Sequence, residues 1–281
     1  MAPTLHCIRH AQGVHNLCIE NHVIPDPDLT QLGVSQCEEL ARRFPYHSEI
    51  DLIVVSPIRR TIYTALYAFA ERIKQGDIKI IALPEIQEIS DVPCDTGSDL
   101  AVLKREVEEK GLPVDLSLLD DRWNVKEGKY APEPNAIMAR ARKARQWLKN
   151  RPEKNIVVVT HGGFLHYFTE DWQDSAMYQG TGWTNTEFRS YTFLDGIDNV
   201  DLRGEPLNED NATMQETEKS RQLRNMHKPL PSKGEQIKFF QEGLAGWDEQ
   251  FAGAVSRQKP ETSAIDPSGE GRPPAEEKTL S

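Results

Sequence analysis

Short runs of aliphatic residues alternate with helical patterns through residues 1–200, and this alternation constrains the fold most strongly. The four clearest runs occupy residues 5–9, 51–56, 78–83 and 155–160, and residues 191–194 are expected to add a fifth, edge strand. Continuous apolar runs suit strands that are buried on both faces, as in parallel sheets covered by helices. The alternation therefore predicts an α/β domain with a mostly parallel sheet.

The segments between these runs have the periodicity of amphipathic helices. Thr30 is a good N-cap for a helix that reaches Phe44. Residues 58–73 and 133–148 place apolar side chains three and four positions apart, which predicts one helix over each segment. Residues 98–131 are expected to form a helical insertion between strands.

The composition changes near residue 200, and the chain divides into three parts. Residues 1–200 form the predicted globular domain, residues 201–258 a partly helical extension, and residues 259–281 a polar tail expected to be disordered. One amphipathic helix is predicted over residues 233–251, with Phe240 and Trp247 on its apolar face. Both roles for this helix remain open: it docks on the domain or it contacts a partner protein.

Charge and hydropathy exclude several classes of function. Acidic residues outnumber basic ones by 11, which argues against a nucleic-acid binder because phosphate neutralisation needs a basic face. No apolar run approaches the roughly 18 residues of a transmembrane helix, and the first residues lack the pattern of a signal peptide. The four cysteines are too sparse for a disulfide scaffold. We therefore expect a cytoplasmic protein with no membrane partner.

Histidines and arginines follow three of the predicted strands. Arg9 and His10 follow the first strand, Arg59 follows the second, and His161 with Gly162 follows the fourth. Ligands of open α/β sheets bind at the carboxyl ends of the strands. Guanidinium groups bind phosphate oxygens without losing their charge, and backbone amides beside glycine add donors. A neutral imidazole attacks phosphorus, and nearby arginines favour that neutral form. The pattern predicts a phosphate site with His10 as nucleophile.

Further motifs accompany these residues in a fixed order. They are R-H-A at 9–11 with Asn16 six residues after His10, L-T-x-x-G-x-x-Q at 29–36, S-P-x-R-R-T-x-x-T-A at 56–65 and T-H-G-G at 160–163. Together they resemble the histidine phosphatase (phosphoglycerate mutase-like) superfamily, and the R-H-A-x-G-x-H-N form is similar to its eukaryotic, fungal-type branch. The resemblance implies a three-layer α/β/α sandwich.

The resemblance also implies roles for individual residues. His10 becomes the phosphorylated nucleophile, Arg9, Arg59 and His161 form the phosphate pocket, and Asn16 is a further donor. The family's proton donor is a glutamate after the third strand. Glu85 and Glu88 both stand there, and Glu88 fits the family's pattern better.

The implied activity is a metal-independent phosphatase that hydrolyses a small phosphorylated substrate through a phosphohistidine. Arginines take the role that Mg²⁺ has elsewhere, so neither a metal ion nor a cofactor is implied. The chain lacks the R-H-Y-G-x-L segment of cofactor-dependent phosphoglycerate mutases, which argues against a glycolytic mutase. Two alternatives stay open: a phosphomutase or phosphotransferase with the same intermediate, and a non-catalytic phosphate-binding scaffold.

Overall fold

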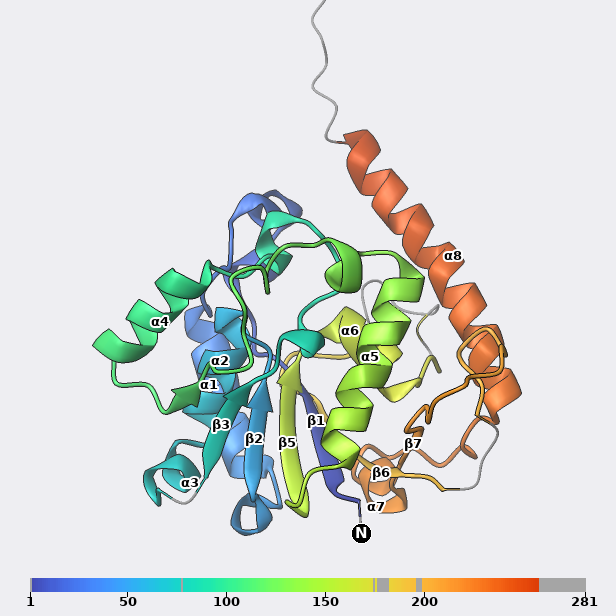
Figure 1. Ribbon diagram of the computed structural model, residues 1–281, viewed down its shortest axis with the longest axis horizontal. Helices are drawn as coiled ribbons and strands as arrows, with labels where there is room; N and C mark the ends of the chain where they lie inside the picture. Colours follow the sequence, from blue (N-terminus) through green and yellow to red (C-terminus); the bar gives the residue numbers. More distant parts are fainter. Residues whose placement is uncertain (1, 77, 174, 176–181, 196–198, 258–281) are drawn as a thin grey trace, which may run out of the picture.

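Figure 1 shows the computed structural model, which describes residues 2–76, 78–173, 175, 182–195 and 199–257. A seven-stranded sheet in the order β4-β3-β2-β5-β1-β6-β7 forms its centre. The strands are β1 (Thr4–Arg9), β2 (Leu52–Val55), β3 (Lys79–Ala82), β4 (Val114–Asp115), β5 (Asn155–Thr160), β6 (Phe188–Phe193) and β7 (Met214–Glu216). The first five strands are parallel to one another, and β6 and β7 are antiparallel to their neighbours.

Helices cover both faces of this sheet. They are α1 (Gln31–Arg43), α2 (Arg59–Ala68), α3 (Ala70–Lys74), α4 (Leu100–Glu109), α5 (Pro134–Lys149), α6 (Gly162–Thr169), α7 (Glu218–Leu223) and α8 (Lys233–Arg257). Helices α1, α2 and α4 lie on one side, and α5, α6 and α8 lie on the other (Figure 1). The expected α/β/α sandwich with a mostly parallel sheet is confirmed.

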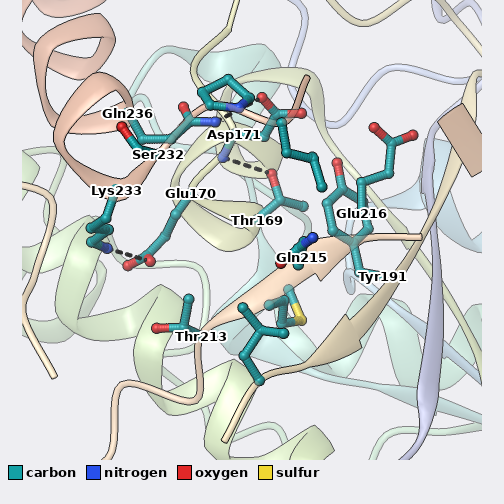
Figure 2. Close-up of a pocket in the computed structure, with 14 residues that line it drawn as sticks. Thr169, Glu170, Asp171, Tyr191, Thr213, Gln215, Glu216, Ser232, Lys233 and Gln236 are labelled. Atoms are coloured by element: carbon teal, nitrogen blue, oxygen red, sulfur yellow. Dashed lines mark hydrogen bonds and ion pairs between the residues drawn. The ribbon is translucent and has the colours of Figure 1, made fainter. Parts of the chain in front are cut away.

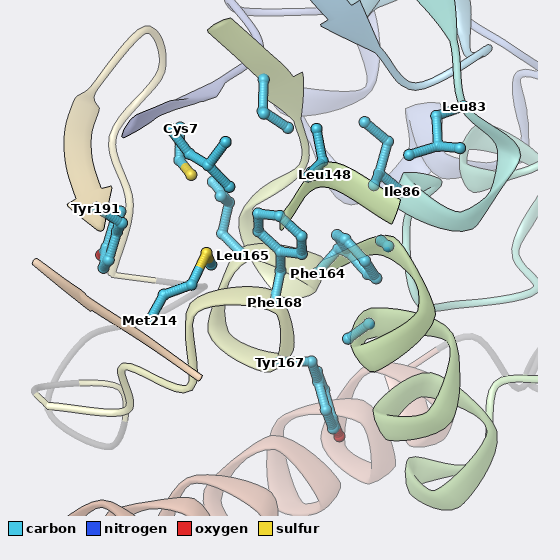
Figure 3. Close-up of a cluster of buried hydrophobic side chains, with 14 of the residues drawn as sticks. Cys7, Leu83, Ile86, Leu148, Phe164, Leu165, Tyr167, Phe168, Tyr191 and Met214 are labelled. Atoms are coloured by element: carbon cyan, nitrogen blue, oxygen red, sulfur yellow. The ribbon is translucent and has the colours of Figure 1, made fainter. Parts of the chain in front are cut away.

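Alternation along each strand divides the apolar core into two clusters. In β5, Ile156 and Val158 pack under α5 and α6, whereas Val157 and Val159 pack under α1 and α2. Figure 3 shows the first cluster, in which the rings of Phe164 and Phe168 of α6 lie beside each other and that of Tyr167 points toward α8. A strand buried on both faces needs apolar residues at every position, which explains the continuous Ile/Val runs of the sequence.

Two short strands were not predicted, β4 within the expected helical insertion and β7 after residue 200, and two predicted elements differ in the structure. The helix expected over residues 58–73 is interrupted at Phe69, where the backbone leaves helical geometry between α2 and α3. The ring of Phe69 is buried edge-on against Phe44, with 5.4 Å between ring centroids. The fifth strand, β6, is not an edge strand, because it pairs with β1 on one side and with β7 on the other.

The segment after residue 200 packs on the same body. Strand β7 extends the central sheet, and α8 buries Phe240 and Trp247 against the core. The ring of Trp172 lies 5.0 Å from that of Phe240 and 5.2 Å from that of Trp247. Of the two roles left open for this helix, the structure shows docking on the domain. The tail expected to be disordered at 259–281 lies outside the described residues.

The described helices include none that is long and apolar enough to cross a membrane. The longest of them, α8, has its apolar residues along one face, and charged residues such as Lys238 and Glu242 occupy its exposed side.

Replacing Phe240 by alanine tests whether α8 is part of the cooperative fold. The ring is 1% exposed, so its loss leaves a cavity and costs about 3–5 kcal/mol in free energy of unfolding. Urea denaturation followed by circular dichroism should show a lower midpoint for Phe240→Ala and an unchanged one for Lys238→Ala, whose side chain is 73% exposed. Equal midpoints for both variants would show that α8 unfolds independently of the domain.

Candidate active site

The carboxyl ends of three neighbouring strands bring the candidate residues together. Strands β2, β5 and β1 are adjacent in the sheet, and the chain segments that follow them carry Arg60, His161 and His10. His10 N donates to Thr160 O at 2.9 Å, which ties the end of β1 to that of β5. The rings of His10 and His161 lie 5.2 Å apart between centroids. The expected gathering of His10 and His161 at one edge is therefore present.

The hydrogen bonds of His10 define which nitrogen carries its proton. Nδ1 lies 2.8 Å from Ala11 O, and because a carbonyl only accepts, Nδ1 is the protonated nitrogen. Nε2 accepts a hydrogen bond from Arg60 Nε at 3.2 Å. Burial, and then the charges of Arg60 and Arg9, hold the pKa of His10 well below its ordinary value. His10 is therefore a neutral imidazole with the lone pair of Nε2 directed toward Arg60.

Arg60, and not the expected Arg59, is the arginine that α2 contributes to the site. Arg60 is fully buried, and its guanidinium donates to His10 Nε2, to Cys94 O at 2.6 Å and to Asp95 Oδ1 at 2.9 Å. Arg59 Nε instead forms an ion pair with Glu106 of α4 at 2.7 Å. The placement of Arg59 in the phosphate pocket was therefore wrong.

Helical geometry explains why the neighbouring arginine is the correct one. Consecutive residues of a helix point about 100° apart, so Arg59 and Arg60 cannot face the same site. Arg60 shares its face with Thr64, four residues later, whose Oγ1 accepts from Ala11 N at 2.9 Å beside His10. The spacing from Arg60 to Thr64 is the sequence signal that identifies Arg60.

Glu88 lies at the N-terminus of α6. Its carboxylate accepts hydrogen bonds from Phe164 N at 2.9 Å, from Gly163 N at 3.3 Å and from Ile89 N at 3.0 Å. Burial, followed by the nearby charge of Asp95, raises the pKa of Glu88 above its usual range even though these N–H groups favour the ionised form. Glu88 therefore retains its proton to a higher pH than an ordinary glutamate.

The remaining predicted residues are placed as follows. Arg9 donates to Trp183 O, and its Nε is buried without a hydrogen-bond partner among the described residues. Asn16 Oδ1 accepts from Gly13 N at 3.0 Å and so closes the turn after His10. Gly162 is the first residue of α6, next to His161. The amides after Gly162 bind Glu88, so part of the helix N-terminus expected to bind a ligand holds the proton-donor candidate instead.

The L-T-x-x-G-x-x-Q motif clamps the loop that follows His10. Gln12 N donates to Gln36 Oε1 at 2.8 Å, and Thr30 Oγ1 donates to Gln12 Oε1 at 2.8 Å. Thr30 also caps α1 as predicted, because its Oγ1 accepts from Gly33 N at 3.0 Å. A Cβ at Gly33 would lie 2.2 Å from Gln12 O, so only glycine allows this close approach.

Two residues of the site were not assigned to it by the sequence. The ring of His15 lies 5.5 Å from that of His10, and burial together with Arg60 lowers the pKa of His15 to about 2. Asp95 holds Arg60, and its Oδ2 accepts from Ser90 Oγ at 2.6 Å. The histidine spacing was visible in the sequence, whereas the position of Asp95 depends on the fold of the loop after β3.

Three buried nitrogens around His10 lack a hydrogen-bond partner among the described residues: Arg9 Nε, His15 Nδ1 and His161 Nδ1. Buried polar groups are normally satisfied, so unpartnered ones at a single site need an explanation. Phosphate oxygens are acceptors and suit the N–H of Arg9 directly. Each neutral imidazole carries one N–H and also donates when its tautomer places the proton toward the ligand. The described residues contain no group of three or more histidine, cysteine or carboxylate side chains arranged to hold a metal ion.

A separate hollow of about 520 Å³ lies at the far side of β6, between the end of α6, β7 and the start of α8 (Figure 2). None of the residues of the histidine site lines this hollow. Glu170 and Lys233 form an ion pair there at 2.7 Å, drawn as a dashed line in Figure 2. The hollow is therefore distinct from the histidine site.

The sequence model of the histidine phosphatase superfamily (branch 1) matches residues 5–204. The chain belongs to this superfamily. Membership places it among the phosphoric ester hydrolases, and the matched region contains every residue of the site.

Individual relatives agree with this membership. Phosphoglycerate mutase-like protein 1 of Arabidopsis thaliana is 28% identical over 203 residues, which cover 58% of this chain and 70% of the relative. A probable phosphatase of Schizosaccharomyces pombe is 30% identical over 172 residues, covering 59% of this chain and 76% of the relative. Among solved structures, a phosphoserine phosphatase mutant from Entamoeba histolytica in complex with phosphoserine is 20% identical with a TM-score of 0.43, over 69% of this chain and 92% of that one, a likeness too weak to add to the family assignment.

Matched substitutions of the two adjacent arginines test the corrected assignment. Arg60→Ala removes three buried hydrogen bonds next to His10, and we expect turnover of p-nitrophenyl phosphate to fall by about 10²–10³-fold. Arg59→Ala removes an ion pair outside the site and should change turnover by less than about threefold. The reverse ranking of the two variants, with both folded by circular dichroism, would contradict the assignment.

Proposed function

We propose that the protein hydrolyses small phosphate monoesters, without a metal ion, through a phosphohistidine formed on Nε2 of His10. The observation that carries this proposal is the neutral state of His10, with Nδ1–H bound to Ala11 O and the lone pair on Nε2. That state is the one required of a nitrogen nucleophile. The hydrogen bond from Arg60 to Nε2 must break before attack, and the oxygens of a bound phosphate are the acceptors that replace Nε2.

In the first step, Nε2 of His10 attacks phosphorus and the bond from phosphorus to the ester oxygen breaks. Glu88 gives its proton to the departing oxygen, which leaves as a neutral alcohol. Arg60, Arg9 and His161 stabilise the charge on the three remaining phosphoryl oxygens. The phosphorylated imidazole is cationic, and the carbonyl of Ala11 stabilises its Nδ1–H.

In the second step, the ionised Glu88 accepts a proton from water as the water oxygen attacks phosphorus. The bond between Nε2 and phosphorus breaks, inorganic phosphate leaves, and Glu88 is again protonated. Burial and Asp95 support both halves of this cycle, since a raised pKa keeps the proton on Glu88 before the first step and favours its return in the second.

The structure favours this hydrolase over the scaffold alternative. The apolar face of α8 motivated the scaffold, and that face packs on Trp172 and Tyr167 of the same chain. A chain that only bound phosphate would also not require Glu88 with a raised pKa. A phosphotransferase uses the same first step and differs only in the acceptor that takes the phosphoryl group from His10.

The phosphoenzyme provides the direct test of His10. In the presence of EDTA, His10→Ala should lower hydrolysis of p-nitrophenyl phosphate by about 10³-fold or more, and mass spectrometry of acid-free quenched wild type should find phosphate on His10. His227→Ala, at an exposed position, is the matched control and should be unchanged. Retained turnover in His10→Ala would overturn the proposal. A phosphoenzyme that releases phosphate only to an added alcohol would identify a phosphotransferase.

The leaving group tests Glu88. Glu88→Gln cannot donate a proton, so hydrolysis of alkyl phosphates should fall by about 10²–10⁴-fold, and hydrolysis of p-nitrophenyl phosphate should fall much less because nitrophenolate needs no proton. Wild-type turnover of the alkyl ester should decline as pH rises through the raised pKa of Glu88, and Glu88→Gln should lack this decline. Glu85→Gln is the matched control, expected to behave as wild type. Equal losses on both esters would exclude Glu88 as the acid.

A further inference from the structure

Lys126 reaches the site from the insertion between α4 and α5, and the mechanism above does not use it. Its Nζ donates to the backbone carbonyl of Glu88 at 2.9 Å. The segment that carries Lys126 is fixed next to the same residues: Gln87 Nε2 donates to Trp123 O at 2.8 Å. The Trp123 ring is fully buried and so close to Gly97 that a Cβ there would lie 2.1 Å from it. Lys126 is therefore held beside Glu88 by a packed loop.

Within the described part of the chain, Lys126 forms no ion pair, and its hydrogen bond goes to a neutral carbonyl. The charged groups that face it are Arg140 and Arg60, which repel it, and Asp95 and Glu88, which attract it. Asp95 already binds Arg60, and the Glu88 carboxylate already binds the amides of α6. Burial first, and then Arg140, lower the pKa of Lys126 to about 7.

A partly buried ammonium without a counter-ion is unfavourable, and an anion arriving from solution offsets that cost. The surrounding carboxylates are engaged, so a ligand is the partner that satisfies Lys126. The guanidinium of Arg60 has protein acceptors, and the unpartnered Nε of Arg9 is available to the phosphoryl group, so Lys126 is a further cation beside Glu88 without a carboxylate partner among the described residues.

The position of Lys126 identifies which part of the ligand it meets. In an in-line displacement, the nucleophile and the leaving oxygen lie on opposite sides of phosphorus. Glu88 protonates the leaving oxygen in the mechanism above, so Lys126, bound to the carbonyl of Glu88, lies on the side of the departing alcohol. The phosphoryl oxygens face Arg9, Arg60 and His161 instead.

We propose that Lys126 binds an anionic substituent on the alcohol part of the substrate, so that the preferred substrates are phosphate monoesters with a second acidic group. That group is a carboxylate or a second phosphate, since both present oxygens to an ammonium. This inference rests on the proposed function, because it takes the direction of the leaving group from the role of Glu88.

Matched ester pairs test it on the full chain. 3-Phosphoglycerate is compared with glycerol 3-phosphate, and propane-1,3-diyl bisphosphate with 3-hydroxypropyl phosphate, so that each pair differs in one anionic group. Wild type should have the higher kcat/KM for the acidic member, and the pair with the larger ratio identifies carboxylate or phosphate as the preferred anion. Lys126→Gln should lower that ratio by about 10–100-fold, the value of a hydrogen bond to a charged group.

Two further variants and a pH series separate binding from a structural role. Lys126→Arg should keep most of the preference, and Lys129→Gln, at an exposed position in the same insertion, should keep all of it. The ammonium of Lys126 is lost above its pKa of about 7, so the wild-type preference should decline from pH 7 to 9. Lys126→Arg should hold it constant because arginine keeps its charge. Ionisation of protein groups that act on both esters of a pair, including Glu88, changes both kcat/KM values alike and leaves their ratio unchanged.

The outcomes distinguish this inference from the function on which it rests. If Lys126→Gln lowers kcat/KM equally for both members of each pair, Lys126 only supports Glu88 and the inference fails while the phosphatase stands. If wild type shows no preference for the acidic esters, the inference likewise fails. If wild type hydrolyses none of the esters, p-nitrophenyl phosphate included, and forms no phosphohistidine, the proposed function fails and this inference with it.

Discussion

The hydrogen bond from His10 Nδ1 to the carbonyl of Ala11 fixes the tautomer on which the chemistry of the site depends. This hydrogen bond requires the Ala11 carbonyl to keep its position. The amides of Ala11 and Gln12, on either side of that carbonyl, are both held by hydrogen bonds. Ala11 N donates to Thr64 of α2, and Gln12 N donates to Gln36 of α1. The loop that carries the nucleophile is thus bound to two helices on one face of the sheet. Groups held by regular elements keep their geometry better than groups on free loops.

Burial has opposite consequences for the bases and the acid of this site, and both suit phosphoryl transfer. It lowers the pKa of His10 and His161, which keeps the imidazoles neutral, and it raises the pKa of Glu88, which keeps the carboxyl protonated. Asp95 reinforces the second effect while it orients Arg60. Asp95, a partly buried carboxylate, therefore both orients Arg60 and raises the pKa of Glu88. Substitution of Asp95 would affect both at once.

The sequence predicted the features that periodicity and motif order encode. Five of the strands and the N-cap at Thr30 follow from local patterns, and the meeting of His10 with His161 follows from the rule that parallel strands end at one edge of the sheet. Arg59 was expected in the site because its residue type suits a phosphate, but residue type does not tell which of two adjacent arginines faces His10. The position of Thr64, one helical turn after Arg60, distinguishes them. Strand β7 was missed because a three-residue strand has no periodicity, and its pairing with β6 depends on the chain around it.

The contacts that the insertion at residues 98–131 makes with the site could not be predicted, because they depend on long-range packing. Asn124 Nδ2 donates to Gly97 O, the Trp123 carbonyl binds Gln87, and Lys126 binds Glu88. No local pattern in residues 98–131 predicts these contacts. They place the insertion on the peptide that carries Glu88, so in the proposed mechanism a change in the loop affects both the surroundings of the departing alcohol and the orientation of the acid.

In the proposed mechanism, the peptide at Gln87 and Glu88 connects the loop that selects the alcohol with the residue that protonates it. The residues proposed to hold the phosphoryl group lie at the ends of β1, β2 and β5, and the sheet determines their positions. The proposed surroundings of the alcohol are a loop whose fold depends on a few side chains, with Trp123 fully buried among them. Loops tolerate sequence change better than a buried parallel sheet does. If the proposed mechanism holds, a chain built in this way keeps its phosphohistidine chemistry while its preference for the leaving group changes.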